Sequence, residues 1–523
     1  MRTARSPVAA AILSLWAVCA VAPAVAQSGT DQSATDARTL SVAAPWEIAS
    51  LDPATHGYVL QRMQVVETLV DAGADGVLRP GLATAWETSE DGLVWRFALR
   101  EEVAFHDGTA FDPEAVVTAL DRARGEPGAL ADVPLERVEA GDGEVVLTLS
   151  EPFAALPAFL ANYASAILAP ASFDADGRSL AAIGTGPYAV ERFAPPLTLD
   201  VVRHDGYWGE APAIERASYG GAGRAETRAL FAESGQGDLV FTIDPSGAAQ
   251  LREAEGVTLH SVAIPRVVSL KVNAGHPFLD DPRARRAIDL AIDRAGIAAG
   301  ILRAPEAAAN QLFAPVLSAW HDPTLAPAER DLERAAALLA ELGWEPGDDG
   351  TLVRDGEPFR LELRTFTDRP ELPLIAAALQ AQLGELGIDV DVAIGNSSDI
   401  PAGHADGTLE LALLARNFGL TPDPIGTALA DFTGGGGDWG AMNWQRDDVD
   451  EALRTVAANA DPEARAEPIR TVREALAEEL PVIPIAWYQH TVASSDRIEN
   501  LTVDPLERSY GIAALRWADD AAE

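Results

Sequence analysis

Two hydrophobic periods alternate along the chain, one typical of strands and one typical of helices. Apolar and polar side chains alternate over 94–99 and again over 144–149, which predicts two half-buried strands. Between them, Asp112 precedes Pro113 and an apolar helical run, so we expect Asp112 to cap a helix that begins at the proline. The segment over 39–44 predicts a first strand.

The second half of the chain repeats these patterns in a strand–helix–strand order. An N-capped apolar helical face is expected over 281–294 and an amphipathic helix over 331–344. A strand over 360–366, a helix over 374–386 and a strand over 388–392 follow. Strands joined by crossover helices predict sheets of the α/β type.

The N-terminus carries the features of a secretory signal. Basic residues precede an apolar run over 8–22 and an A-x-A site at 24–26, which predicts a signal peptide over 1–26. A retained membrane anchor is the alternative, although the apolar run is short for a span. The only cysteine, Cys19, lies in this segment, so a cleaved chain has no disulfides. The polar residues over 27–38 predict a disordered lead-in.

Length and charge restrict the class of protein further. At 523 residues the chain is too long for one core, so two or three domains are expected. The formal net charge is −41, from 80 acidic and 39 basic residues. So negative a body repels nucleic acid and anionic membrane surfaces, and neither is expected as a partner.

The sequence contains no familiar catalytic constellation. No H-E-x-x-H, G-x-S-x-G or Walker motif occurs, and the cysteine lies in the signal segment. The histidines are scattered singly, so no local metal cage is encoded. We therefore expect no catalytic residue, no metal and no cofactor, and hence a protein that is not an enzyme.

The stretch from Asp75 to Arg122 resembles a known signature. It is similar to that of the large solute-binding proteins of ABC importers, which take up peptides, nickel chelates and opines. The matching residues are Asp75-Gly76, Pro80-Gly81-Leu82-Ala83, Trp86, Asp91-Gly92, Trp95, Phe97, Leu99-Arg100 and Phe105-His106-Asp107-Gly108.

Further markers of this family follow in the same order. They include Glu67-Thr68-Leu69-Val70, Gly184-Thr185-Gly186-Pro187-Tyr188, the YWG run at 207–209 and the close at 480–485. The resemblance implies an α/β fold of the periplasmic binding protein type II, two-lobed, cluster-C-like, with an extra subdomain in the first lobe. The implied parts are the main domain of lobe I (39–79, 184–264 and 488–518), its extra subdomain (80–183) and lobe II (265–487).

The segment over 416–424 is expected to contact the ligand. Peptide-binding members carry an aspartate for the peptide's α-ammonium where this chain has Leu420, which cannot pair with a cation. The nickel branch resembles the segment better: Arg416 and Asp423 match, and Phe418 replaces a tryptophan. The histidine with which that branch contacts metal has no counterpart, because Gly434–Gly437 occupies the region.

The resemblance suggests further ligand contacts around the cleft. Core packing is an equal alternative for the tryptophans, and a surface ion pair is an alternative for Arg508. The additional candidates are His56, Tyr58, Trp439, Asn443, Trp444, Tyr488, His490, Arg508, Ser509 and Tyr510.

These features together predict the substrate-binding component of an ABC importer. It is expected to be a soluble periplasmic monomer without direct membrane insertion. It would capture a small polar ligand (a peptide, an opine or a metal chelate) between two lobes and deliver it to an inner-membrane permease complex. An exported hydrolase of peptides or chelates, and a ligand sensor for a membrane receptor, are the alternatives.

Overall fold

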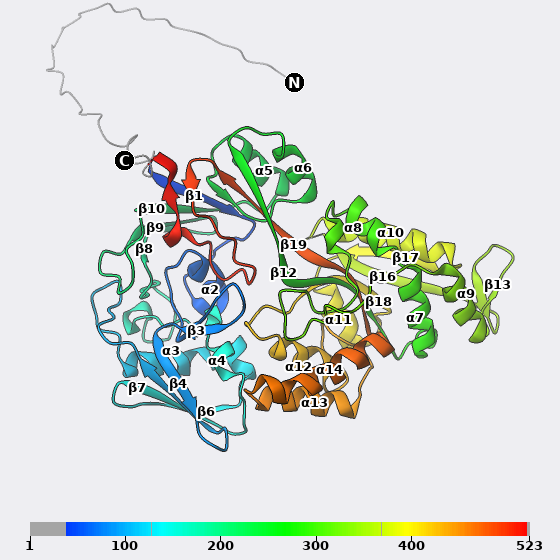
Figure 1. Ribbon diagram of the computed structural model, residues 1–523, viewed down its shortest axis with the longest axis horizontal. Helices are drawn as coiled ribbons and strands as arrows, with labels where there is room; N and C mark the ends of the chain where they lie inside the picture. Colours follow the sequence, from blue (N-terminus) through cyan, green and yellow to red (C-terminus); the bar gives the residue numbers. More distant parts are fainter. Residues whose placement is uncertain (1–37, 127, 368, 520–523) are drawn as a thin grey trace, which may run out of the picture. The chain divides into compact units, whose positions relative to one another are not determined.

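The computed structural model describes residues 38–126, 128–367 and 369–519. The predicted signal peptide over 1–26, and the predicted lead-in over 27–38 except its last residue, lie outside the described residues. A mixed ten-stranded sheet forms the centre of the fold (Figure 1). Its strands, in order across the sheet, are β17 (Asp389–Gly395), β16 (Arg360–Phe366), β18 (Leu411–Asn417), β12 (Val257–Val272), β19 (Val482–Ser495), β11 (Leu239–Val240), β1 (Thr39–Ala44), β10 (Arg216–Gly221), β9 (Thr198–Arg203) and β8 (Tyr188–Ala194).

Two long antiparallel strands, β12 and β19, lie side by side in the middle of this sheet. Their register shifts between Ala263 and Val267. On one side of the shift β19 also pairs with β11, and on the other β12 pairs with β18 from Arg266 onward. The two strands therefore carry the chain from one half of the sheet to the other. The predicted lobe boundaries at 264/265 and 487/488 fall inside them, and the division into lobes stays a prediction.

A separate four-stranded sheet confirms the strand and helix predicted around Asp112. Trp95 and Phe97 on β5 are buried, as their alternation predicts. The Asp112 side chain accepts from the backbone nitrogen of Ala115 at 2.9 Å and caps α3 (Pro113–Ala123). The order across this sheet is β4 (Ala83–Thr88), β5 (Val94–Leu99), β7 (Glu144–Leu149) and β6 (Leu135–Ala140). The small sheets are β2 (Val70–Ala72) with β3 (Leu78–Pro80), β13 (Glu345–Pro346) with β14 (Leu352–Arg354) and β15 (Glu357–Pro358), and β20 (Ile498–Glu499) with β21 (Arg516–Trp517).

The apolar face predicted over 281–294 forms two helices instead of one. The first helix ends before Asp293, which caps the second, and the break turns Arg294 toward the backbone oxygens of Asp289 and Pro484 at 3.0 and 2.8 Å. A buried guanidinium needs such acceptors, which explains the break.

No helix within the described residues has the length and apolar character of a membrane span. The other helices, with these two, are α2 (Pro53–Arg62), α4 (Leu156–Phe159), α5 (Ala225–Glu233), α6 (Pro245–Leu251), α7 (Pro282–Ala291), α8 (Arg294–Gly300), α9 (Leu332–Glu341), α10 (Glu371–Glu385), α11 (Asp399–Asp406), α12 (Ile425–Phe432), α13 (Asp447–Ala458) and α14 (Pro462–Glu479).

One hydrophobic cluster joins the region of the four-stranded sheet to α12, α13 and α14. Asn162 donates from Nδ2 to the backbone oxygen of Leu420 at 2.6 Å. Gly426 on α12 faces Phe159 so closely that a Cβ at Gly426 would lie 2.5 Å from the Phe159 Cζ. These contacts connect the predicted extra subdomain with the predicted lobe II.

Three of the sequence segments that resemble family markers meet at one buried carboxyl group. The Glu67 side chain accepts from Thr185 Oγ1 at 2.8 Å, from Trp208 Nε1 at 2.9 Å and from the Tyr207 hydroxyl at 3.1 Å. The Arg100 guanidinium lies 4.0 Å from the Trp208 ring centroid. These markers therefore form scaffold around Glu67.

We expect the Glu67→Gln variant to become more stable relative to the wild type as the pH rises. Burial raises the pKa of Glu67 from an ordinary 4.5 to about 7, against the opposing effect of its hydrogen bonds from Trp208, Thr185 and Tyr207. A raised pKa stabilises the folded protein fully at a pH below the pKa that Glu67 has in the unfolded chain. This stabilisation, of about 3 kcal/mol in total, is lost as the pH rises through the pKa of Glu67 in the folded protein.

Melting temperatures of the wild type and of Glu67→Gln, measured from pH 5 to 8, test this expectation. The variant should gain on the wild type steadily over this range, because glutamine has no charge to desolvate. Glu210→Gln, which changes an exposed side chain, serves as the control. Parallel melting curves for Glu67→Gln and the wild type would contradict a raised pKa.

Candidate functional site

A cluster of charged and aromatic side chains is buried where β12 and β19 pass between the two halves of the sheet. Arg266 comes from β12, Arg62 from the end of α2, and Glu507 from the C-terminal segment. Arg62 and Arg266 are only 9% and 8% exposed. We call this group the arginine cluster; its members are Arg62, Arg266, Arg369, Glu371, Tyr488, His490, Glu507 and Tyr510.

Glu507 bridges two arginines of the cluster. Its carboxylate accepts from Arg266 Nη2 at 2.9 Å and lies 3.8 Å from Arg62 Nη2. Its backbone oxygen accepts from Arg62 Nε at 2.5 Å. Burial acts to raise the pKa of Glu507, but the charges of Arg266 and Arg62 outweigh it and help to hold the pKa at about 2. Glu507 is therefore a fixed negative charge at neutral pH.

Aromatic rings flank the guanidinium groups. The Arg62 guanidinium lies 4.2 Å from the Trp46 ring centroid. Arg266 and Arg369 lie 5.3 and 5.2 Å from the centroid of the same ring, that of Tyr488. Cation–π contacts of this kind orient the planar groups and shield them from water.

Burial shifts the pKa values of the other titratable members in the direction of their neutral forms. Burial lowers the pKa of His490 to about 4, so the imidazole is uncharged at neutral pH. Burial raises the pKa of Tyr510 to about 12 and also raises the pKa of the Glu371 carboxyl. The positive charge of the cluster thus comes from its arginines.

Several buried polar atoms of the cluster have no hydrogen-bond partner among the described residues. They are Arg62 Nη1, Arg266 Nε, Glu371 Oε1 and the Tyr510 hydroxyl. A buried charged group without a partner costs considerable free energy, so such atoms mark positions for an ordered water or a ligand. Here they present two guanidinium donors, one carboxyl acceptor and one hydroxyl, which can donate or accept.

A cavity of about 170 Å³ adjoins the cluster and is lined in part by Glu371, Tyr488 and His490. Thr242 also lines it, and its backbone has a φ of 58°, which is strained for a β-branched residue. The backbone oxygen of Thr242 accepts two hydrogen bonds from Arg228, at 2.8 and 3.1 Å, and its buried Oγ1 finds no partner within the described chain. Strain and an unsatisfied hydroxyl at one residue indicate a functional constraint there.

The structure brings three of the sequence candidates into this site. Tyr488 and His490 belong to β19, and the Tyr510 ring packs tilted against Phe241, with the ring centroids 4.2 Å apart. Tyr58 lies next to the site, since its ring centroid is 5.7 Å from the Arg62 guanidinium.

His56 lies beside Tyr58 at the entry of α2. Their ring centroids are 6.3 Å apart. The Tyr58 hydroxyl donates to the backbone oxygen of Glu47 at 3.2 Å, and its ring meets Tyr163 edge-on at 5.9 Å. The expected ligand contacts of His56 and Tyr58 stay predictions.

Arg416, Phe418 and Asp423, in the segment over 416–424, contact other parts of the protein, and their expected ligand contacts stay predictions. Phe418 is only 2% exposed and meets Phe313 edge-on at 5.2 Å. Asp423 forms an ion pair with Arg465 and accepts a hydrogen bond of 3.0 Å from the backbone nitrogen of Ile425, the first residue of α12. The side chains of Phe418 and Asp423 therefore make these contacts inside the protein.

Arg416 is likewise engaged internally. Its Nε and Nη2 each donate to one oxygen of the Asp431 carboxylate, both at 2.7 Å. Asp431 is 2% exposed, so this bidentate pair is buried on the protein side.

The candidates after the glycine run also have protein partners. Trp444 donates from Nε1 to Glu479 at 2.6 Å, and Asn443 donates from Nδ2 to Asn273 at 2.8 Å. Trp439 packs partly buried against the second hydrophobic cluster. Core packing, the alternative weighed for the tryptophans, fits these contacts.

Arg508 and Ser509 line a different cavity, of about 240 Å³. Arg508 pairs with Asp71 at 2.7 Å and donates to the backbone oxygen of Ala72 at 2.8 Å. The backbone nitrogen of Ser509 donates to Asp504 at 3.1 Å. The ion pair weighed as the alternative for Arg508 is present.

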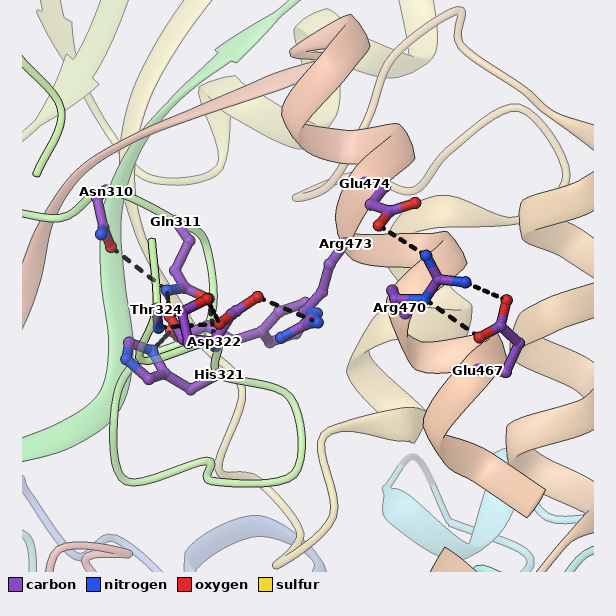
Figure 2. Close-up of polar contacts among 10 residues, drawn as sticks. Asn310, Gln311, His321, Asp322, Thr324, Glu467, Arg470, Arg473 and Glu474 are labelled. Atoms are coloured by element: carbon purple, nitrogen blue, oxygen red, sulfur yellow. Dashed lines mark hydrogen bonds and ion pairs between the residues drawn. The ribbon is translucent and has the colours of Figure 1, made fainter. Parts of the chain in front are cut away.

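A long loop fixes the neighbouring face of β19 (Figure 2). Gln311 exchanges two hydrogen bonds with the backbone of Asp322, at 2.8 and 2.9 Å, and Asp322 pairs with Arg473 on α14 at 3.6 Å. Trp487 donates from Nε1 to the backbone oxygen of Gln311 at 3.1 Å. The loop thus ties the crossing strand to α14.

Five members of the cluster were not anticipated from the sequence: Arg62, Arg266, Arg369, Glu371 and Glu507. Arg266 alone carried a local signal, because a charged residue interrupts the apolar run over 262–268 there. No three histidine, aspartate or glutamate side chains within the described residues gather as a metal-ligand set.

Comparisons with known proteins agree on one family. The model of the bacterial extracellular solute-binding proteins, family 5 Middle, matches residues 77–439. The nickel-binding periplasmic protein of Escherichia coli (strain K12) is 27% identical over 492 residues, covering 89% of this chain and 92% of that protein. The glutathione-binding protein GsiB of Salmonella paratyphi A is 24% identical over 446 residues, covering 81% and 83%. The crystal structure of NikA from Brucella suis in complex with Fe(III)-EDTA superposes with a TM-score of 0.83 at 26% identity, covering 92% of this chain and 99% of that one.

Proposed function

The chain belongs to the bacterial extracellular solute-binding proteins of family 5, and from this premise we propose that it captures a small polar ligand at the arginine cluster. Its α/β fold is the type II periplasmic binding fold, as the sequence predicted. Proteins of this family supply ABC importers, which confirms the functional class expected from the sequence.

The observation that supports this location is the group of buried polar atoms without hydrogen-bond partners beside β12 and β19. The guanidinium donors of Arg62 and Arg266 come from segments that the sequence assigns to lobe I and lobe II, and both are buried without a full set of acceptors. A ligand that bridges such groups stabilises the closed arrangement of two lobes over the open one. The register shift between β12 and β19 offers a place at which the two halves of the sheet turn against each other.

The proposal extends to the cellular setting. The protein would act as a monomer in the periplasm after removal of the signal peptide, and it would hand the unchanged ligand to an inner-membrane permease complex. The relatives named above bind nickel and glutathione, so peptides, opines and metal chelates all remain within the ligand range. Exposed Leu420 stands where the resemblance places the aspartate of peptide-binding members, which favours a ligand other than a free peptide.

Native mass spectrometry of the protein as isolated tests capture. We expect a bound small molecule that is lost on unfolding, is retained again when it is added back to refolded protein, and keeps its mass during prolonged incubation. A change in its mass would favour the hydrolase alternative. Failure to bind any component of a concentrated periplasmic extract would contradict solute capture.

A further inference from the structure

We propose that the ligand is a small organic acid of net negative charge, held by a carboxylate or equivalent oxyanion against Arg62 and Arg266. The proposal rests on solute capture at the arginine cluster. It adds the chemical class of the ligand and the two residues that select it.

The first argument is the pair of donors that the protein leaves unused. Glu507 is the shared partner of Arg62 and Arg266, yet neither Arg62 Nη1 nor Arg266 Nε donates a hydrogen bond of ordinary geometry among the described residues, and the Arg62 side chain interacts with one further polar group, the Tyr510 hydroxyl. Both side chains are more than nine-tenths buried. A guanidinium has five donors in a planar fork, and an oxyanion is the acceptor that matches this geometry.

The second argument is the balance of charge. The buried side chains of Arg62 and Arg266 face the carboxyl groups of Glu507 and Glu371, with the partly exposed Arg369 beside them, and burial favours the uncharged form of Glu371. The remaining positive charge lies inside a protein with 80 acidic and 39 basic residues. Burying an uncompensated cation is strongly unfavourable, and a bound anion would compensate it.

The surroundings of the cluster would strengthen such a contact. Trp46 and Tyr488 lie against the guanidinium groups and limit their access to water, so the electrostatic attraction is screened less than at the surface. Glu371 Oε1 is a buried acceptor without a partner within the described chain. A hydrogen-bond donor on the ligand, such as a hydroxyl or an N–H group, would fit there.

A role confined to holding the hinge together is the competing explanation. Arg285 is a useful comparison, because it is 2% exposed and donates to the backbone oxygens of Glu479, Leu279 and Asp280 at 2.6, 2.7 and 3.1 Å. It is therefore a buried structural arginine outside the cluster.

The class of ligand can be tested on the wild-type protein. Unfolded and refolded protein, freed of ligand, is mixed with periplasmic extract that ion exchange has separated into anionic, neutral and cationic fractions. We expect only the anionic fraction to raise the melting temperature, by about 3–5 °C. A rise with the neutral or cationic fraction alone would overturn the proposal but leave solute capture standing, whereas no rise with any fraction would contradict capture itself.

The two residues are tested by substitution. Arg62→Gln and Arg266→Gln should each weaken binding of the active component of the anionic fraction by about 30-fold or more. Arg285→Gln, the matched control, should lower the melting temperature of the ligand-free protein without changing this affinity. If both cluster variants behave like Arg285→Gln, the cluster is structural and the proposal fails. Arg266→Lys keeps the charge and should retain part of the affinity, which supplies a folded variant should Arg266→Gln not fold.

Discussion

Replacing Arg416 by leucine is expected to lower the free energy of unfolding by about 3–5 kcal/mol. Arg416 holds the buried carboxylate of Asp431 by two hydrogen bonds of 2.7 Å. Without the guanidinium, that carboxylate loses its bidentate partner in a position from which water is excluded. Urea denaturation followed by tryptophan fluorescence measures the loss.

Two further variants distinguish the loss of this buried ion pair from the effect of removing any arginine. Arg137→Leu removes an exposed ion pair with Glu139 and should cost less than about 1 kcal/mol. Adding Asp431→Leu to Arg416→Leu removes both charges and should restore part of the lost stability. An Arg416→Leu protein that unfolds like the wild type yet no longer binds ligand would instead make Arg416 a ligand residue, as the resemblance implied.

Replacing Gly426 by valine is expected to weaken ligand binding by roughly 5- to 150-fold. A Cβ at this position would lie 2.5 Å from Phe159 Cζ, so α12 and the predicted extra subdomain could not keep their contact. The backbone bond from Ala154 to Ala457, at 2.7 Å, crosses the same contact. If ligand capture brings these surfaces together, overpacking between them destabilises the closed state, and ligand binding becomes weaker.

Isothermal titration with the isolated ligand, together with the radius of gyration with and without ligand, measures both consequences. Gly384→Val on α10 is the matched control, because an added Cβ there meets nothing within 4 Å. An unchanged affinity of Gly426→Val, combined with a lower melting temperature of the ligand-free protein, would show that the contact is permanent and independent of closure.

Local patterns were sufficient for much of the scaffold. The alternation that includes Trp95 and Phe97, and the cap at Asp112, depend on neighbours within a few residues, and the structure confirms them. The helix predicted over 281–294 failed at one point, because Arg294 is satisfied by the backbone of Pro484. A partner that distant in the chain leaves no trace in the local period.

The proposed binding site shows the opposite balance. Arg62 and Glu507 are bonded across 445 positions of the chain, and Arg266 and Glu507 across 241. Neither spacing follows a helical or strand period, so only Tyr488, His490 and Tyr510 among the members could be named from the sequence. Phe418 has an aromatic side chain that suits a cleft wall and a core equally well; the structure buries it, and its contact with a ligand stays a prediction.

The amino-acid sequence by itself determined the class of this protein: its α/β fold, its family and the order of its elements. Turns, caps and alternating strands are encoded by neighbouring residues, and the family markers report on that local scaffold. Only the tertiary structure decided which charged side chains lie together inside the protein. Glu67 gathers three markers as scaffold, while Arg62, Arg266 and Glu507 meet at the crossing of β12 and β19. Burial, charge compensation and unsatisfied donors are properties of side chains brought together by folding, so they become visible only once the segments that carry them are in contact.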